Sequence, residues 1–192
     1  TAAAPPAVLC QEDMAGLQML LPYISTSQKN TQLMSRRLAL IEANREISAE
    51  LEIPALYNVI MARAAALFDC EAAKLFLLDG ATGDLYSANG MEDLKLVEEK
   101  KSLAAFVIST GQVVSLPRDP AAHPQWNGSV DGTASPKNAI AWPVVNSKNM
   151  MGVIELCNMR RAEAFSPEEE LLIKGFVGQC SEALQNAGVL GK

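Results

Sequence analysis

Two pairs of short apolar segments, each joined by a tight polar turn, constrain the fold more than any other feature of the sequence. Residues 74–78 and 85–87 are separated by a turn that contains Asp79-Gly80 and Gly83-Asp84. Residues 139–145 and 151–157 flank a polar turn of four residues, 146–149. Short turns of Gly, Asp, Asn and Ser between apolar runs are typical of β-hairpins. The sequence therefore predicts two antiparallel strand pairs.

Helical patterns surround these hairpins. Residues 53–68 carry an apolar stripe at helical spacing, with Pro54 in the first turn, where proline is tolerated. Residues 102–110 are expected to form a short helix with Ser102 as its N-cap and Gly111 just beyond its end, and residues 113–116 a strand. Ser166-Pro167-Glu168-Glu169 has the form of a capping box, so the last helix begins at Pro167. The predicted class is α+β, a central antiparallel sheet flanked by helices.

The N-terminal part of the chain is predicted to form two helices. Residues 11–24 have apolar positions at helical spacing, the polar stretch 25–30 breaks the pattern, and a longer helix follows over residues 31–51. In it, Leu33, Leu40 and Ile47 recur every seven residues, Leu51 follows four residues later, and Met34, Leu38 and Ile41 widen the stripe. Such a stripe packs either on the core of its own domain or on a second copy of the chain. We divide the chain into a leader with a short helix, 1–30, and one domain with long N- and C-terminal helices, 31–192.

Composition disfavours several kinds of partner. The chain has 16 Lys and Arg against 22 Asp and Glu, and its net charge of −6 repels the phosphates of nucleic acid. Its apolar runs are shorter than the roughly 20 residues of a bilayer-spanning helix, so no membrane partner is expected. The four cysteines are scattered along the sequence, which favours a reducing, cytoplasmic setting.

Residue types that catalyse reactions or bind metals are not grouped. His123 is the one histidine, and the cysteines lack the spacing of metal ligands or of a Cys–His pair. The sequence also lacks a phosphate-binding loop and a dinucleotide-binding turn. We therefore expect no catalytic residue, no metal and no cofactor. Residues 117–137, which contain four prolines, form a longer connection than usual, and such loops are commonly functional lids.

Two features point to a ligand. Lys100 and Lys101 precede the helix that starts at Ser102, and its first N–H groups would stabilise an anion such as phosphate; a solvated basic pair is the alternative. Glu155 interrupts an apolar strand and shares a face with the apolar residues two positions away. It either points inward, where a donor such as the exocyclic amine of a purine would satisfy it, or lies exposed on an edge strand.

From about residue 42 to residue 187 the sequence resembles the GAF domain, a small-molecule sensing module. The resemblance is carried by ISAELEIPALYNVIMARAAALF, AAKLFLLDGATGDL, SLAAFVISTGQVV, HPQW, NAIAWPVVN, MGVIELCNM and FSPEEE. It implies a GAF- or PAS-like antiparallel sheet with flanking helices. Within the family, the pattern is most similar to the GAF domains of cyclic nucleotide phosphodiesterases and cyclases.

That similarity implies particular site residues. The N-K, F, D-E signature of those domains is matched by Asn158, Phe165 and the pair Glu169-Glu170, with Met159 where the signature has Lys. The implied ligand contacts are the side chains and backbone groups of Lys74, Leu103, Ala104, Asp131 and Glu155. By the resemblance, the backbone of Leu103 and Ala104 meets the cyclic phosphate, and Lys74 stands where such binders often have a small polar residue.

The expected function is a regulatory sensor domain of a cyclic nucleotide signalling protein, a phosphodiesterase by the resemblance. It would bind cyclic AMP or cyclic GMP, or descend from a domain that did, and it would form a homodimer through residues 31–51 and 167–187. The alternative is a degenerate, ligand-free GAF module that serves protein interaction and dimerisation. A small enzyme acting on an anionic metabolite is a third class.

Overall fold

The computed structural model describes residues 11–50, 52–87, 95–97, 101–131, 133, 135–147, 149–160 and 166–188. The chain divides into two compact units, Thr1–Ala39 and Leu40–Lys192. The first contains most of helix α1, which begins at Gln11 and ends at Ala49. The second contains the sheet, the other helices and the last residues of α1. The candidate site lies within this second unit.

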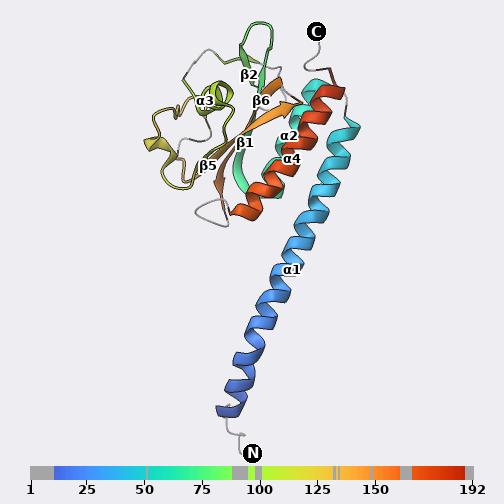
Figure 1. The fold of residues 1–192 in the computed structure, drawn as a ribbon, viewed down its shortest axis with the longest axis vertical. Helices are drawn as coiled ribbons and strands as arrows, with labels where there is room; N and C mark the ends of the chain where they lie inside the picture. The colour runs from blue at the N-terminus through green and yellow to red at the C-terminus, as the bar shows by residue number, and fades with distance from the viewer. Residues whose placement is uncertain are drawn as a thin grey trace, which may run out of the picture. The chain divides into compact units, whose positions relative to one another are not determined.

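A single antiparallel sheet organises the second unit (Figure 1). Its strands lie in the order β3-β2-β1-β6-β5-β4. Their bounds are Cys70–Leu78 for β1, Leu85–Ser87 for β2, Lys95–Leu96 for β3, Val114–Leu116 for β4, Ala139–Asn146 for β5 and Asn149–Met159 for β6. The β1–β2 and β5–β6 pairs are antiparallel neighbours, which confirms both predicted hairpins. The long strands β1 and β6 pair at the centre of the sheet.

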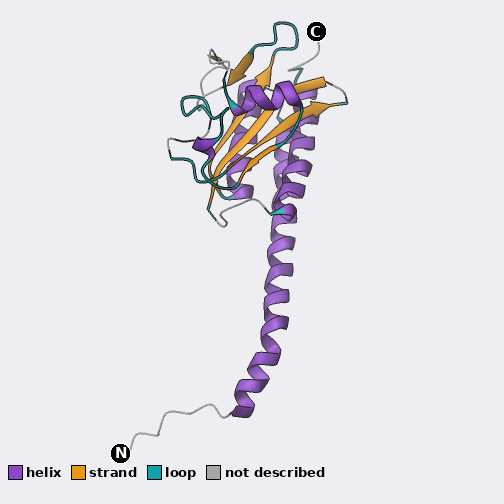
Figure 2. Cartoon of the chain, turned by 60° about the vertical axis from the view of Figure 1, so that its left-hand side comes forward, coloured by secondary structure: helices purple, strands orange, loops and turns teal. Residues whose placement is uncertain are grey.

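The helices cover the two faces of the sheet (Figures 1 and 2). Helix α2, Ile53–Phe68, and helix α4, Pro167–Asn186, pack on one face. Helix α3, Leu103–Thr110, packs on the other, followed in the chain by the 3₁₀ turn η1, Pro120–Ala122. The α+β class predicted from the sequence is confirmed. Within the described residues, no helix has both the length and the apolar content that crossing a bilayer requires.

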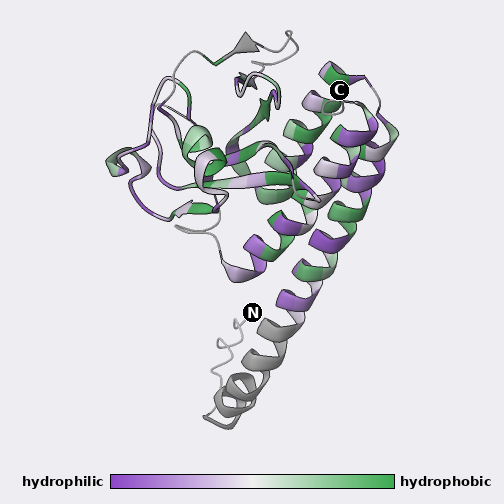
Figure 3. Cartoon of the chain, turned by 45° about the horizontal axis from the view of Figure 1, so that its top comes forward, coloured by the Kyte–Doolittle hydropathy of each residue, from purple (hydrophilic) through white to green (hydrophobic). Residues whose placement is uncertain are grey.

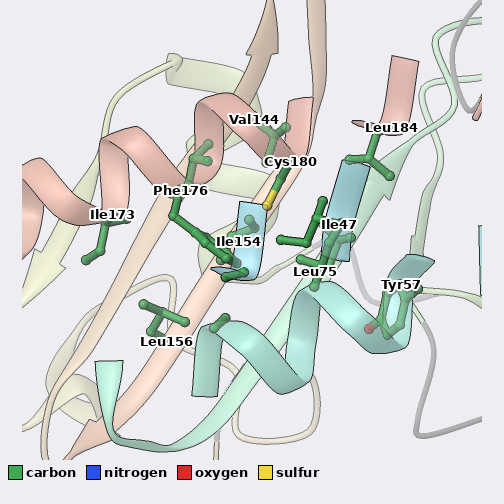
Figure 4. Close-up of a cluster of buried hydrophobic side chains, with 14 of the residues drawn as sticks. Ile47, Tyr57, Leu75, Val144, Ile154, Leu156, Ile173, Phe176, Cys180 and Leu184 are labelled. Atoms are coloured by element: carbon green, nitrogen blue, oxygen red, sulfur yellow. The ribbon is translucent and has the colours of Figure 1, made fainter. Parts of the chain in front are cut away.

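The face under α2 and α4 holds the larger buried cluster (Figure 4). Phe68 of α2 and Phe176 of α4 meet edge to face, with ring centroids 5.8 Å apart. Ile47, near the end of α1, is fully buried in the same cluster, and Leu40 packs against it. Leu40 and Ile47 of the seven-residue stripe therefore pack on the core of their own domain, which is one of the two alternatives that the sequence left open. Leu33 of the same stripe is half-buried.

The face under α3 holds a second cluster. Leu103, Ala104 and Val107 of α3 pack on Phe76 of β1 and Val153 of β6. These apolar residues surround the polar groups described below. The helix itself begins and ends as predicted, because the Ser102 side chain caps it and Gly111 follows it with a left-handed φ of 68°.

The structure corrects two details of the sequence prediction. The polar stretch 25–30 does not break a helix, because α1 continues through it from Gln11 to Ala49. This stretch has neither Pro nor Gly, and the Thr31 hydroxyl donates to the Ser27 carbonyl at 2.9 Å within the helix. Strand β3 and the turn η1 were not predicted, because two or three residues are too few to show a period. Leu51 lies outside the described residues.

Candidate functional site

The candidate site is built on the two central strands, on the face under α3. Lys74 of β1 and Glu155 of β6 are directly paired across the antiparallel ladder. Glu155 is 1% exposed, so the inward alternative of the sequence prediction is confirmed. Side chains two positions apart share one face of a strand, and Val153 and Cys157 accordingly lie in the buried cluster around it. The strand pairing therefore places an acid and a base side by side under α3.

Asp131 reaches this face from the loop that follows β4. Its side chain is fully buried, and both carboxylate oxygens accept the Leu103 N–H, at 3.1 and 3.0 Å. Oxygen Oδ2 also accepts the Asn127 N–H at 2.8 Å. A carboxylate at the first residue of a helix is stabilised by the helix dipole and by the free amides of the first turn. Asp131 thus binds the amide that the resemblance assigns to a cyclic phosphate.

Lys74 ties the same loop to the sheet. Its ammonium nitrogen donates to the Val130 carbonyl at 2.5 Å, and its charge stabilises the ionised form of Asp131. The Asn127 side chain donates to the Lys101 carbonyl at 2.9 Å, so the loop is also attached to the segment that precedes α3. Residues 127–131 are therefore held between β1 and the start of α3 by side-chain hydrogen bonds.

Burial sets the protonation of Asp131. Desolvation raises the pKa of this carboxyl above its ordinary 3.8, against the amide hydrogen bonds from Leu103 and Asn127, the charge of Lys74 and a hydrogen bond with Glu155, which all lower it. Burial is the largest of these effects, so the Asp131 carboxyl retains a proton more readily than an exposed carboxyl does.

The cysteine thiols of the described residues are buried, and burial favours their protonated form. Cys157 lies 3.5 Å from Glu155 Oε1, and burial together with that carboxylate raises its pKa. Burial likewise raises the pKa of Cys180, and it raises that of Cys70 to about 11. Thiolates are the nucleophilic and metal-binding form of cysteine. Among the residues that the structure describes, no group of three or more His, Cys, Asp or Glu side chains gathers as a metal site would require.

The signature residue Asn158 lies apart from this polar group, near the end of β6. Its backbone is left-handed, with φ 56°, and its side-chain oxygen accepts the Lys137 N–H at 2.7 Å. Its amide nitrogen lies 2.9 Å from Glu71 Oε2, 3.0 Å from Thr133 Oγ1 and 3.1 Å from the Ser135 carbonyl. Asn158 therefore fastens the end of the long loop to the start of β1.

A second asparagine completes this attachment, and sequence reasoning missed it. The Asn138 side-chain oxygen accepts the Met159 N–H at 2.8 Å, and the Asn138 carbonyl accepts the Asn158 N–H at 3.0 Å. Asn138 stands immediately before β5 and is 2% exposed. A polar residue at the start of a buried strand is the signal that could have identified it, because a buried amide needs partners.

The remaining predicted residues lie elsewhere. Glu169 accepts the Ser166 N–H at 2.9 Å in the capping box of α4, and Glu170 is half-buried in the same first turn. Met159, at the position of the signature lysine, is buried in the cluster under α2 and α4. Ala104 is fully buried in α3. Phe165 and Lys100 lie outside the described residues.

His123 has a packing role in the described structure. Its ring meets Phe106 of α3 edge to face at 6.1 Å, and its Nδ1 accepts the Gln125 N–H at 3.3 Å. Together with Asp131 and Lys74, it attaches the proline-bearing loop to the α3 side of the sheet. The site thus combines a buried acid pair, a lysine and a loop that they hold in place.

Comparison with known proteins identifies the family. The model of the GAF domain matches residues 52–184, which include the sheet, α2, α3 and most of α4. The chain belongs to the GAF domain family. Solved GAF structures agree: the GAF domain of an Acinetobacter phosphoenolpyruvate-protein phosphotransferase superposes with a TM-score of 0.67 at 16% identity, covering 80% of this chain and 95% of that one.

Two further proteins that are similar to this GAF domain have names that state different functions from each other. Free methionine-R-sulfoxide reductase from Neisseria meningitidis superposes with a TM-score of 0.65 at 15% identity, over 80% of this chain and 90% of that one. Dual 3',5'-cyclic-AMP and -GMP phosphodiesterase 11 from Drosophila melanogaster is 22% identical over 200 residues, covering 89% of this chain. This GAF chain spans 14% of the length of that phosphodiesterase. At these identities the comparisons show the fold.

Proposed function

We propose that this GAF domain is a non-catalytic regulatory module of a cytoplasmic cyclic nucleotide signalling protein of the phosphodiesterase kind. Its similarity to the Drosophila phosphodiesterase supports this assignment. The high pKa values of its described thiols also argue against the thiol chemistry of a reductase. The ligand we propose is a cyclic nucleotide, bound between the sheet and α3 through Lys74, Leu103, Ala104, Asp131 and Glu155.

The observation that carries the proposal is the Asp131 carboxylate on the Leu103 amide. A cyclic phosphate at that amide would replace the carboxylate, because two anions do not share one donor. The departure of the Asp131 side chain would break the bond between this loop and the first residue of α3, leaving the loop attached through Asn127 and Lys74. A purine amine could then donate to Glu155. Ligand binding would thereby change the attachment of the loop, which is how a sensor domain can transmit a signal.

Calorimetric titration with cyclic AMP and cyclic GMP tests this function. We predict saturable heat with the wild-type chain. Glu155→Ala is predicted to weaken binding by about 1–3 kcal/mol, because it removes a charged acceptor. Glu155→Gln is the matched control of equal size and should retain part of the affinity. Equal affinities for all three proteins would remove Glu155 from the ligand contacts, and circular dichroism would verify that each variant is folded.

A second candidate function is favoured by the same geometry. The amide of Leu103, the ammonium of Lys74 and the carboxylate of Asp131 all bind groups of the protein itself. A site satisfied in this way suits a ligand-free GAF module whose role is dimerisation through residues 31–51 and 167–187. Absence of heat at high micromolar nucleotide, with folded protein, would favour this function over the first. Light scattering would then report whether the chain is a dimer.

A further inference from the structure

Asn127 stands at the start of the turn that carries Asp131. Its carbonyl accepts the Val130 N–H at 3.0 Å and the Asp131 N–H at 2.8 Å, and its side-chain oxygen accepts the Ser129 N–H at 3.0 Å. Its own N–H donates to Asp131 Oδ2. An asparagine side chain that accepts the amide two residues later stabilises a turn. Asn127 therefore determines the shape of residues 127–131, and with it the direction in which the Asp131 side chain leaves the loop.

The Asn127 side chain also reaches the segment that enters α3. Its amide nitrogen donates to the Lys101 carbonyl at 2.9 Å. Lys101 precedes Ser102, the N-cap of α3, and lies two residues before Leu103. The side chains of α3 are largely hydrophobic (Figure 3), so the loop attaches through backbone groups at the start of the helix. Asn127 thus contacts the chain on both sides of the Asp131–Leu103 hydrogen bond, the turn that carries the acceptor and the segment that carries the donor.

Two attachments flank the Asp131–Leu103 bond and do not depend on it. Lys74 donates to the Val130 carbonyl from the sheet, and Asn127 donates to the Lys101 carbonyl beside α3. Both bonds end on carbonyl groups, so an anion at the Leu103 amide would not compete with them. The loop would stay in place while the Asp131 side chain leaves the amide. Exchange between the carboxylate and a ligand is then a local event, and its equilibrium depends on where the loop holds Asp131.

We propose that Asn127 is a positioning residue of this site. It holds the Asp131 carboxylate on the Leu103 amide, and it thereby sets how strongly the protein's own carboxylate competes with an anionic ligand for the start of α3. The inference rests on the proposed function for the identity of that competitor, a cyclic nucleotide. The positioning itself is a property of the protein without ligand, and it can be measured separately.

The substitution Asn127→Ser separates the contact with α3 from the turn. A serine hydroxyl can still accept the Ser129 N–H, because serine and asparagine stabilise similar turns, but it lacks the amide nitrogen that reaches the Lys101 carbonyl. Asn58→Ser is the matched control. The Asn58 side chain donates to the Pro54 carbonyl in α2, also at 2.9 Å, and Asn58 is half-buried as Asn127 is.

Amide hydrogen exchange followed by NMR, without ligand, tests the positioning. The exchange rate of the Leu103 N–H, relative to amides of the central strand β6, is expected to rise roughly three- to tenfold in Asn127→Ser, because loss of one hydrogen bond shifts a local opening equilibrium by about that factor. A general loss of stability would speed the β6 amides at least as much. Asn58→Ser should keep the wild-type ratio. An unchanged ratio in Asn127→Ser, or the same rise in Asn58→Ser, would overturn the positioning.

Calorimetry with cyclic AMP and cyclic GMP tests the competition. Asn127→Ser is expected to bind roughly three- to tenfold more tightly than the wild type, because the state with a free Leu103 amide becomes more populated by that factor. Asn58→Ser should bind as the wild type does. Equal or weaker binding by Asn127→Ser would overturn the competition, since removing a residue that only supports the fold does not raise affinity. Absence of heat from all three proteins would instead contradict the proposed function, and the exchange ratio would still decide whether Asn127 positions Asp131.

Discussion

At the scale of single residues, the acid pair of Asp131 and Glu155 is the feature on which the proposed sensor function depends. Asp131 is fully buried, yet it occupies the amide at the start of α3 and holds Asn127 as well. Its raised pKa means that the Asp131 carboxyl binds a proton more tightly in the folded protein than in the unfolded chain. By linkage, the stabilisation from that proton is complete below the ordinary pKa of 3.8 and is lost as the pH rises through the folded pKa.

The pH dependence of stability gives the first prediction at this scale. Asp131→Asn cannot lose a proton, so its free energy of unfolding should gain on that of the wild type as the pH rises above 3.8. The substitution also replaces one of the two carboxylate oxygens, which accept from Leu103 and Asn127, by an NH2 group, and this lowers stability equally at every pH. Urea unfolding of both proteins between pH 4 and pH 8 measures the difference. Parallel pH profiles would show that Asp131 titrates like an exposed carboxyl.

The backbone of Asn158 gives a second prediction. Asn tolerates the left-handed conformation, whereas Ala at φ 56° is strained. Asn158→Ala loses the hydrogen bond to Lys137 as well, so we expect a loss of roughly 2–3 kcal/mol in the free energy of unfolding. Asn158→Gly loses the same bonds without the strain and should be the more stable of the two variants. Equal urea midpoints for the two would mean that strain contributes nothing here.

At the scale of elements, the sequence predicted those helix boundaries that depend on neighbouring residues. Helix α2 begins and ends where Pro54 and the apolar stripe placed it, and α4 begins at Pro167 behind its capping box. The contact of Asp131 with Leu103 spans 28 residues of sequence, and no local pattern encodes it. The resemblance named both residues as ligand contacts but gave no reason to expect that they bind each other. The continuity of α1 was missed because polar composition was taken as a break.

The capping box of α4 gives the prediction for this scale. Ser166→Ala removes the acceptor for the Glu169 N–H, at 3.2 Å, and should lower the free energy of unfolding by about 1 kcal/mol. Ser166→Asp retains an acceptor at the same position and should recover most of the loss. Chemical denaturation monitored by circular dichroism compares the three proteins. A deficit in Ser166→Asp as large as in Ser166→Ala would show that the helix start is held by contacts other than the cap.

At the scale of the whole molecule, α1 has two apolar faces, one buried and one exposed. One face completes the core of the GAF unit, and the other, formed by Met34, Leu38 and Ile41, is exposed within the residues proposed for dimerisation, 31–51. Ile47 and Ile41 are chemically identical representatives of the two faces, 0% and 64% exposed. A pattern of hydrophobic residues alone could not assign them, since both sets recur with a period close to that of the helix. Only the packing of each side chain distinguishes the two faces. The same substitution should therefore affect folding at Ile47 and assembly at Ile41.

The paired substitution makes that separation measurable. Ile47→Ala should lower the free energy of unfolding by about 2–4 kcal/mol, because it leaves a cavity in the cluster under α2 and α4. Ile41→Ala should change the stability of dilute, monomeric protein by less than about 0.5 kcal/mol, since an exposed side chain loses little on truncation. It should nevertheless weaken the dimer in light scattering, whereas Ile47→Ala should leave the mass of the folded fraction unchanged. Loss of the dimer only in the Ile47 variant would place the interface on the opposite face of α1.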